Sequence, residues 1–197
     1  MKPSRTADGI WKIDKNEIGV IFGVGIGGIR TFEEESVNYA KTGETLGPRY
    51  SPFFIPKMIS DIAAGQISIN YGFHGPNFAT TSACASSTNA LASAFNLIRL
   101  GKANAIVTGG AEAAIWPTGV GGFNAMHALS TRNDDPEHAS RPFSASRDGF
   151  IMGEGAGVLI LEELEHALKR GAHIYAEVAG AGMSADAHHI TASHPEG

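Results

Sequence analysis

Short apolar runs alternate with longer segments of mixed polarity along most of the chain. The apolar runs are bounded by glycine or polar residues and predict β-strands at residues 18–23, 77–82, 105–110 and 174–180. The other segments predict helices at residues 32–41, 56–71, 86–100 and 164–170, and a hairpin of two strands at residues 150–152 and 158–161. Alternation of strand and helix is typical of a layered α/β fold.

The only cysteine of the chain, Cys84, falls between a predicted strand and a predicted helix. The N-terminus of a helix favours a thiolate over a thiol, and its free N–H groups stabilise an oxyanion, so this place suits a nucleophile. Ser86 or Ser87 can cap the helix, and Gly101 ends it. The alternative is a small, buried and inert cysteine, which is the usual role of a lone cysteine.

The helix after Cys84 is expected to face the core of the protein. Its apolar residues recur at helical spacing along one side. These residues are Ala90, Leu91, Ala94, Phe95, Leu97 and Ile98.

Composition and charge narrow the function classes. The 197-residue chain has a net charge of −5, so it lacks the electrostatic footprint of a nucleic-acid-binding protein. A single cysteine excludes an intrachain disulfide and fits a reducing compartment. No apolar run approaches the ~20 residues that span a bilayer, and residues 1–5 lack the apolar stretch of a signal peptide. We therefore expect a cytoplasmic protein that contacts neither nucleic acid nor membrane.

Several short motifs follow one another in order along the chain. Residues 81–86, Thr-Ser-Ala-Cys-Ala-Ser, resemble the nucleophile segment of the β-ketoacyl-acyl-carrier-protein synthases, the condensing enzymes of fatty-acid and polyketide synthesis. The other segments that resemble this family are residues 23–28, 51–56, 109–112, 121–123, 128–133, 141–143, 147–150, 153–157 and 162–172. The resemblance covers residues 17–197, and the subtype it suggests is the long-chain elongating type II synthase of bacteria.

The resemblance implies a thiolase-like α/β fold of αβαβα layers, built from two similar halves. This chain would hold the fold only in part. Residues 1–170 correspond to the N-terminal half without its first strand–helix units, and residues 171–197 correspond to the start of the C-terminal half. The family is homodimeric, and the strand before the nucleophile pairs across the dimer interface.

The resemblance also implies an acyltransferase that forms a carbon–carbon bond without a cofactor or metal. An acyl chain moves from an acyl carrier protein to Cys84, and decarboxylation of malonyl-acyl-carrier protein yields a carbanion that attacks the acyl-cysteine. In the family, two histidines and a lysine of the C-terminal half support the second step. Neither histidine motif, His-Gly-Thr or Gly-His, occurs in this chain. We therefore expect the isolated chain to be inactive in condensation.

Three apolar residues are assigned to substrate binding by the resemblance. Ile26, Phe54 and Phe123 match residues that line the acyl tunnel near the dimer interface. The alternative for each of them is an ordinary place in the hydrophobic core.

Three polar residues near the end of the chain match a loop at the mouth of the family's pantetheine channel. These residues are Asp186, His189 and Thr191. His188 stands where the family usually has tyrosine. The His188-His189 pair alone offers too few ligands for a metal site. Residues 130–148 are polar and predict a surface loop.

Functions from three classes stay open at this point. The favoured one is the central part of a β-ketoacyl synthase. The second is a relative such as a polyketide-type ketosynthase or a non-elongating partner subunit that shapes an acyl channel, although such partners usually lack the cysteine. The third is an unrelated binding module with a structural cysteine.

Overall fold

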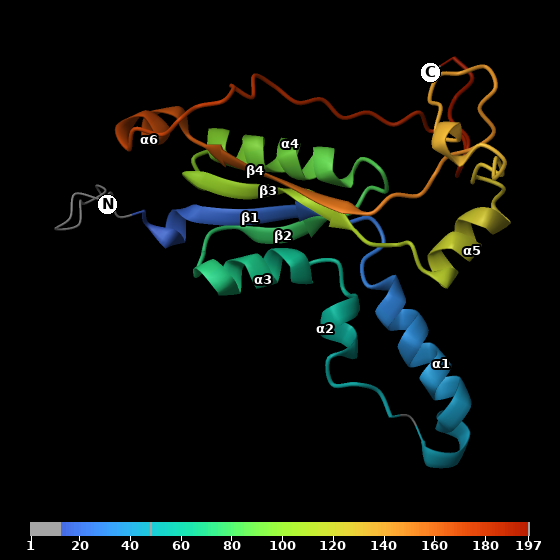
Figure 1. Cartoon of the computed structure of the whole chain (residues 1–197). Helices are drawn as coiled ribbons and strands as arrows, with labels where there is room; N and C mark the ends of the chain where they lie inside the picture. The colour runs from blue at the N-terminus through green and yellow to red at the C-terminus, as the bar shows by residue number, and fades with distance from the viewer. Residues whose placement is uncertain (1–12, 48, 197) are drawn as a thin grey trace.

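The computed structural model describes residues 13–47 and 49–196 (Figure 1). Residues 1–5, on which the expectation of no signal peptide rests, lie outside the described residues. Two short 3₁₀ helices span Lys15–Glu17 and Pro136–His138. The remaining elements, in chain order, are β1 (Ile18–Gly23), α1 (Ile29–Leu46), α2 (Phe54–Met58), α3 (Ile62–Tyr71), β2 (Asn77–Thr80), α4 (Ser86–Arg99), β3 (Ala105–Glu112), α5 (Pro117–Ala125), β4 (Gly155–Glu162) and α6 (Leu164–Lys169).

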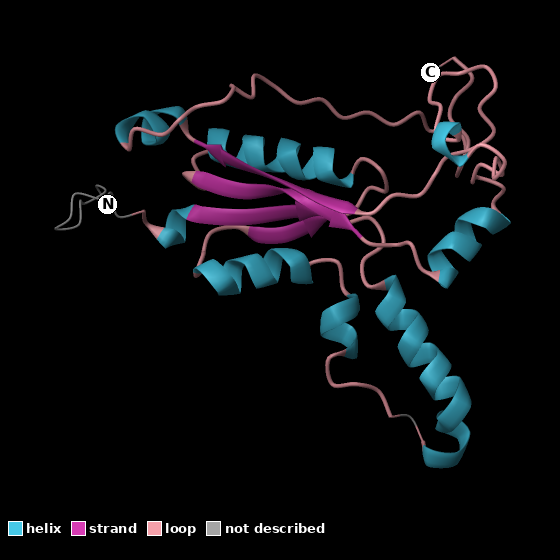
Figure 2. Cartoon of the chain, in the orientation of Figure 1, coloured by secondary structure: helices cyan, strands magenta, loops and turns pink. Residues whose placement is uncertain are grey.

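A four-stranded sheet in the order β2-β1-β3-β4 lies at the centre of these elements (Figure 2). β1 is parallel to both β2 and β3, so the carboxyl ends of these three strands meet at one edge of the sheet. β4 runs antiparallel to β3, with Ala105 opposite Glu162 and Glu112 opposite Gly155. All six residues of β1 are buried, because helices cover both faces of this central strand.

The two faces of the sheet are covered by different helices, α4 on one and α3 on the other (Figure 1). Alanines of α4 allow a close approach to the first face. The buried cluster there consists of Ile21, Ala90, Ala94, Ala103 and Ile106. The cluster under α3 consists of Val20, Phe22, Val24 and Ala64. The α/β class predicted from the alternating pattern is therefore confirmed.

Most of the predicted elements near the sheet are confirmed. β1, β2, β3, α4 and α6 fall where the pattern places them, and α1 extends beyond the predicted helix at both ends. The end of α4 at Gly101 is also confirmed. Gly101 adopts a φ of +65° and donates its N–H to the carbonyl of Ile98 at 2.9 Å, while Lys102 donates to Leu97 at 2.9 Å. This pair of bonds is the Schellman ending that glycine favours.

The prediction of one helix over residues 56–71 is wrong, because the helix is broken into α2 and α3. Ile59 is extended, with a ψ of 142°. The carbonyl of Met58 accepts the N–H of Gly28 at 3.0 Å, which is a tertiary bond in place of a helical one. The contact with the turn after β1 therefore ends α2 where the sequence pattern would continue it.

The predicted hairpin over residues 150–163 is wrong as well. Residues 155–162 form one continuous strand, β4, because β3 offers it a partner along its whole length. Phe150 makes only an isolated bridge with Leu129. No strand forms at residues 174–180, since none of the described residues pairs with this exposed segment.

Helix α5 has no counterpart among the predicted elements. It contains three glycines, Gly119, Gly121 and Gly122, which weaken the helical pattern. Pro117 occupies the first turn, where its missing N–H costs nothing. The carboxylate of Glu33 in α1 accepts the N–H of Thr118 at 2.9 Å and also its hydroxyl, so α5 is capped by a side chain from a distant helix.

Helices α1 and α2 project away from the sheet as an arm (Figure 1). Aromatic rings line this arm. The ring centroids of Tyr39 and Tyr50 are 5.7 Å apart, those of Tyr50 and Phe54 are 5.3 Å apart, and those of Phe54 and Phe32 are 6.5 Å apart. These rings stay partly open to solvent, so the arm offers an apolar surface.

The outer part of β4 is uncovered. Val158, Leu159 and Ile160 are 54%, 54% and 66% exposed, although apolar strand residues are normally buried.

Within residues 13–47 and 49–196, no helix has the length and apolar character that a bilayer span requires.

Candidate active site

Cys84 lies in the short turn between β2 and α4, at the carboxyl edge of the parallel strands. Its thiol is free and exposed. Ala83, the residue before it, adopts a φ of +50°, which is uncommon for a residue with a side chain. The turn is fastened to β1, because Val24 donates its N–H to Thr80 at 3.1 Å and Thr81 donates its hydroxyl to Val24 at 3.0 Å.

The hydroxyl of Ser86 holds this turn in shape. It accepts the N–H of Ser82 at 2.9 Å and donates to the carbonyl of Ala83 at 2.6 Å. Ser86 is only 4% exposed, so these bonds lie out of water. The left-handed conformation of Ala83 is therefore stabilised by a buried side chain of the following helix.

The prediction that Ser86 or Ser87 caps α4 is wrong. The residue at the N-cap position is Ala85, and within the described part of the chain no side chain caps the helix. The Ser86 hydroxyl is taken by the turn. Ala85 and Ser86 donate their backbone N–H groups to the carbonyls of Ser82 and Ala83, at 3.1 Å each. The helix start beside Cys84 therefore lacks a side-chain cap, and the dipole of α4 favours a thiolate or an oxyanion there.

Two glycines let the start of α4 sit directly on the sheet edge. A Cβ at Gly23, the last residue of β1, would lie 2.4 Å from the backbone nitrogen of Ser87. A Cβ at Gly110 in β3 would lie 2.0 Å from the Ser87 hydroxyl and 2.7 Å from the carbonyl oxygen of Gly23. Any larger residue at these positions would displace the helix that follows Cys84.

Ile26 lies in the tight turn after β1, beside the nucleophile turn. A Cβ at Gly25 would be 3.7 Å from the carbonyl oxygen of Ala83, which shows how closely the two turns approach. Gly27 has a φ of +81°, a conformation that favours glycine. The Ile26 side chain is 42% exposed, so it lies outside both buried clusters of the described residues.

Phe54 and Phe123 lie on different helices. Phe54 opens α2 and stacks on Tyr50 in the projecting arm. Phe123 lies on α5, and its ring meets that of Phe150 edge-on with centroids 5.3 Å apart. Both are half-buried and neither belongs to the two buried clusters described above.

Asp186, His189 and Thr191 lie in a segment after α6 that has no regular structure and in which nearly every residue is exposed. Their hydrogen bonds connect residues of the same segment. His189 accepts the N–H of Thr191 at 3.2 Å, and Asp186 accepts the N–H of His194 at 3.1 Å. The structure does not bring these three residues together with Cys84 among the contacts of the described residues, so their place beside the site stays a prediction.

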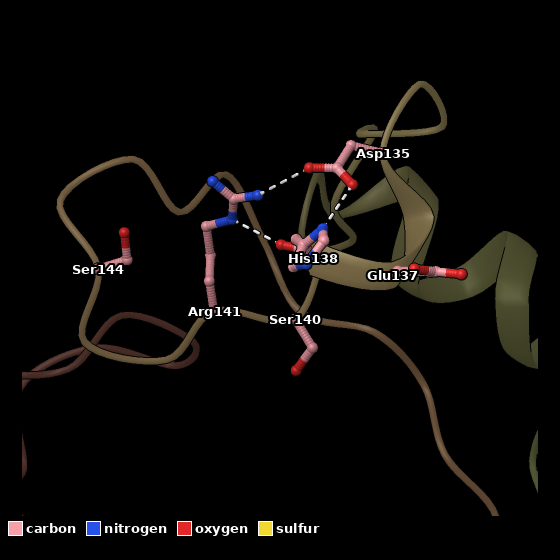
Figure 3. Close-up of a pocket in the computed structure, with 6 residues that line it drawn as sticks. All are labelled: Asp135, Glu137, His138, Ser140, Arg141 and Ser144. Carbon is pink, nitrogen blue, oxygen red and sulfur yellow. Dashed lines mark hydrogen bonds and ion pairs between the residues drawn. The ribbon is translucent and has the colours of Figure 1, made fainter.

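The loop over residues 130–148 holds an ion-pair cluster around an open cavity of about 440 Å³ (Figure 3). Asp135 bonds to His138 Nδ1 at 2.7 Å and meets Arg141 Nη2 at 3.5 Å. The hydrogen bond with His138, followed by the charges of His138 and Arg141, lowers the pKa of Asp135. Asp135, His138 and Arg141 thus bond to one another within this loop. Most residues of the loop are exposed, as expected for a surface loop.

A second, mostly apolar cavity of about 460 Å³ lies behind the turn after β1. Gly27, Gly28, Ile59, Ala63 and Glu112 are among the residues that line it. Neither this cavity nor the one in the loop is lined by Cys84. In the described part of the chain, no three His, Cys, Asp or Glu side chains gather as a metal site.

Sequence reasoning assigned no role to Glu112, which bonds to the turn that carries Ile26. Glu112 ends β3 and accepts N–H groups from Gly25 and Ile26 at 2.9 Å and 2.8 Å. Residues 109–112 were recognised only as a segment that resembles the family, and nothing in the sequence indicated that Glu112 binds the turn after the first strand.

Residues 7–167 match the model of the family described as beta-ketoacyl synthase, N-terminal domain. The chain belongs to this family. Membership rules out the alternative of an unrelated binding module, and it confirms the resemblance on which the site residues were chosen.

Two curated relatives share the same name. The chain is 52% identical over 186 residues to the 3-oxoacyl-[acyl-carrier-protein] synthase 2 of Synechocystis sp. This alignment covers 94% of the chain and 44% of the relative. The chain is 51% identical over 191 residues to the protein of that name from Staphylococcus aureus, with 94% and 46% covered. The chain thus spans less than half the length of these relatives.

Solved structures agree with the fold. A beta-ketoacyl synthase from Burkholderia phymatum superposes with a TM-score of 0.73 at 35% identity, over 82% of this chain and 38% of that one. The ketosynthase of a type II polyketide synthase, solved in complex with its acyl-carrier protein and bound to a hexaketide, gives a TM-score of 0.76 at 34% identity, over 85% and 42%. The thiolase-like α/β fold is therefore confirmed for the part of the architecture that this chain holds.

Proposed function

We propose that this chain is the nucleophile-bearing half of a 3-oxoacyl-acyl-carrier-protein synthase of fatty-acid synthesis. The observation that carries the proposal is the exposed thiol of Cys84 at the uncapped N-terminus of α4. The curated relatives at 51% and 52% identity, both named for this activity, support it.

The first chemical step uses residues of this chain. The Cys84 thiolate attacks the thioester carbonyl of acyl-carrier protein, the new carbon–sulfur bond forms, and the carrier leaves as a thiolate that takes up the proton released by Cys84. In the proposal, backbone N–H groups at the start of α4 stabilise the oxyanion of the tetrahedral intermediate. A thiolate both attacks a thioester readily and leaves readily, which the next step requires.

The second step needs groups that this chain does not contain. Malonyl-acyl-carrier protein loses CO₂, and the resulting carbanion attacks the carbonyl carbon of acyl-Cys84. The bond to Cys84 breaks, and a β-ketoacyl thioester two carbons longer leaves on the carrier. In the proposal, the two histidines of the family's C-terminal half stabilise the enolate, and a catalytic lysine comes from the same half. The isolated chain is therefore not expected to condense.

The proposal assigns the remaining site residues as follows. Ile26, Phe54 and Phe123 line the acyl tunnel, and the exposed aromatic arm around Phe54 belongs to a homodimer interface. Residues 1–170 form the N-terminal half, and residues 171–197 begin the C-terminal half. A catalytic free thiol suits a reducing compartment, so the proposed location is the cytoplasm.

The partner in the proposal is an acyl carrier protein in its acyl and malonyl forms. One of the similar solved structures is a ketosynthase in complex with such a carrier, which supports this choice. Asp186, His189 and Thr191 are assigned to the loop that receives the pantetheine arm. They sit in an exposed segment, as a loop at a channel mouth would.

An elongation assay on the full-length protein tests the proposal. Acyl-carrier protein and malonyl-carrier protein are supplied together, and the β-ketoacyl product is measured. The wild-type protein should form it, and the Cys84→Ala variant should lose at least about a thousandfold in rate, as expected for removal of a covalent nucleophile. Elongation by Cys84→Ala at the wild-type rate would contradict the assignment.

A polyketide-type ketosynthase is the second candidate, and the structural likeness to such an enzyme favours it. The higher identity to the fatty-acid synthases favours the first. The same assay separates them, since a fatty-acid synthase elongates saturated acyl chains, whereas a polyketide ketosynthase elongates unreduced poly-β-keto chains. A non-elongating partner subunit would give no product with either substrate.

A further inference from the structure

The turn between β1 and α1 is held in place by hydrogen bonds to one carboxylate. Glu112 Oε2 accepts the N–H groups of Gly25 at 2.9 Å and Ile26 at 2.8 Å, and Oε1 accepts that of Gly27 at 3.4 Å. Three successive N–H groups thus converge on one side chain 85 to 87 residues away in the sequence. Hydrogen bonds to an ionised acceptor are the stronger kind, so this is the main anchor of the turn.

The opposite side of the same turn is fixed by backbone. Gly28 donates its N–H to the carbonyl of Met58 at 3.0 Å. A Cβ at Gly28 would lie 2.3 Å from the carbonyl oxygen of Lys57, so the turn and the end of α2 are in direct contact. The turn is therefore held between the end of β3 and the end of α2.

Among residues 25–28, only Ile26 has a side chain. This side chain points away from the Glu112 carboxylate. The backbone N–H of Ile26 bonds to Glu112 while its side chain stays 42% exposed. The turn also approaches the carbonyl of Ala83, next to Cys84. The carboxylate consequently determines where the Ile26 side chain stands relative to the nucleophile turn.

We infer that Glu112 is a positioning residue that holds Ile26 in the acyl tunnel and thereby sets the chain length that the synthase accepts. The inference rests on the proposed function, because it takes Ile26 to line the tunnel. Glu112 does not touch the substrate and acts only through the Gly25–Gly27 backbone. When its bonds are lost, Ile26 is no longer fixed and tunnel length is less sharply defined.

Two substitutions in the full-length protein remove the hydrogen bonds of Glu112 to different extents. Glu112→Gln keeps one oxygen for the N–H groups of Gly25 and Ile26 but turns its amide toward Gly27, and Glu112→Ala removes every acceptor. The measurement is the ratio of kcat/KM for the preferred acyl-carrier protein to that for the acyl chain two carbons longer. This ratio should fall about fivefold in Glu112→Ala and less in Glu112→Gln.

A double substitution shows whether Glu112 acts through Ile26. Ile26→Ala should itself change the ratio, and adding Glu112→Gln should then change it no further, because the side chain being positioned is gone. Changes that add independently would overturn the inference. Glu163→Gln serves as the matched control, since this carboxylate also accepts a backbone N–H, that of His166 at 2.7 Å, but at the distant helix α6. It should leave the ratio unchanged.

The outcomes separate the inference from the proposed function. A wild-type protein that elongates no acyl-carrier protein overturns both. A wild-type protein that elongates, together with folded Glu112 variants that keep the wild-type ratio, overturns the inference alone. If Glu112→Ala does not fold, the ratio measured with Glu112→Gln and with its Ile26→Ala combination decides.

Discussion

A single buried hydroxyl, that of Ser86, determines the shape of the turn that presents Cys84. It joins the N–H of Ser82 to the carbonyl of Ala83 across the turn. Because the Ser86 hydroxyl is used in this way, α4 starts just after Cys84 without a side-chain cap. The helix therefore lacks a side-chain capping bond, and the proposed chemistry of Cys84 uses the dipole at this uncapped end.

Ser86→Ala tests this role. The variant removes the buried hydroxyl that bonds both the N–H of Ser82 and the carbonyl of Ala83, which should cost about 1 kcal/mol in unfolding free energy. It should also slow acylation of Cys84 about tenfold or more, since the turn loses its fixed geometry. Denaturant unfolding and acyl transfer from acyl-carrier protein measure the two effects in the full-length protein.

Ser87→Ala is the matched control for that prediction. Ser87 is the next residue of the same helix and is exposed, and its hydroxyl makes no hydrogen bond to the described part of the chain. It should change both quantities little. Equal losses in Ser86→Ala and Ser87→Ala would contradict the role given to the Ser86 hydroxyl.

A second residue-scale effect concerns Glu162, which ends β4 and fixes α6. Arg170 donates Nε to Oε1 at 2.8 Å and Nη2 to Oε2 at 2.7 Å, and His166 bonds to the same carboxylate. Burial alone would raise the pKa of Glu162, but the hydrogen bonds from Arg170 and then His166 outweigh it and lower the pKa. The ionised form is thus favoured by folding.

The lowered pKa gives a stability term with a defined pH range. A depressed carboxyl pKa contributes stability above the unfolded value of about 4.5, and this is lost as pH falls through the folded value. Arg170→Met should therefore destabilise by about 1 kcal/mol at pH 7, after allowance for solvent screening of the half-exposed arginine. Melting at pH 7 and at about pH 3 measures this. A difference between variant and wild type that is as large at the acidic pH would contradict it.

At the scale of elements, the contact between α4 and the sheet edge depends on Gly110. Gly110→Ala should destabilise by about 2–4 kcal/mol, because its Cβ would meet the backbone carbonyl of Gly23 as well as the Ser87 side chain. Gly121→Ala in α5 is the matched control. A Cβ there meets nothing within 4 Å, so alanine should be neutral or stabilise by up to about 1 kcal/mol. Thermal melting of both variants decides, and a Gly110→Ala protein as stable as wild type would contradict the contact.

The elements that the sequence pattern could predict are those whose local pattern matches the environment that they meet in the fold. β1 is apolar throughout, and α4 has small residues on one side and a glycine end, so local pattern and tertiary structure agree. Residues 174–180 have a strand-like pattern as well, but a strand needs a neighbouring strand, and none is present among the described residues. The break between α2 and α3 depends on Gly28 reaching Met58, which no local pattern reveals.

The candidate site also has a part that the sequence predicts and a part that it does not. The place of Cys84 between strand and helix was predictable, because the residues around it alone define it. The hydrogen bond between Glu112 and the N–H of Ile26 was not predictable, because it depends on β1 and β3 being neighbours in the sheet. The Ser86 bonds were missed for a further reason. A serine at the start of a helix predicts a cap, and only the left-handed turn at Ala83 gives it a different partner.

At the scale of the whole molecule, the described residues form one sheet, and its edge strand β4 is largely exposed. Val158 and Ile160 are more than half exposed, and residues 171–196 run on without regular structure. Because the chain spans less than half of its curated relatives, we expect the isolated 197-residue chain to unfold without a sharp transition and to bind a hydrophobic dye. Calorimetry of the isolated chain tests this, and a cooperative, monodisperse protein would contradict it.

The identity of the acylated residue tests the central claim most directly. The full-length protein is mixed with acyl-carrier protein in the absence of malonyl-carrier protein, digested, and analysed by mass spectrometry. The account predicts a single acyl group in thioester linkage on the peptide that contains Cys84, and none in the Cys84→Ala variant. An acyl group on another residue, or an unmodified Cys84 in a protein that still elongates, would contradict the account.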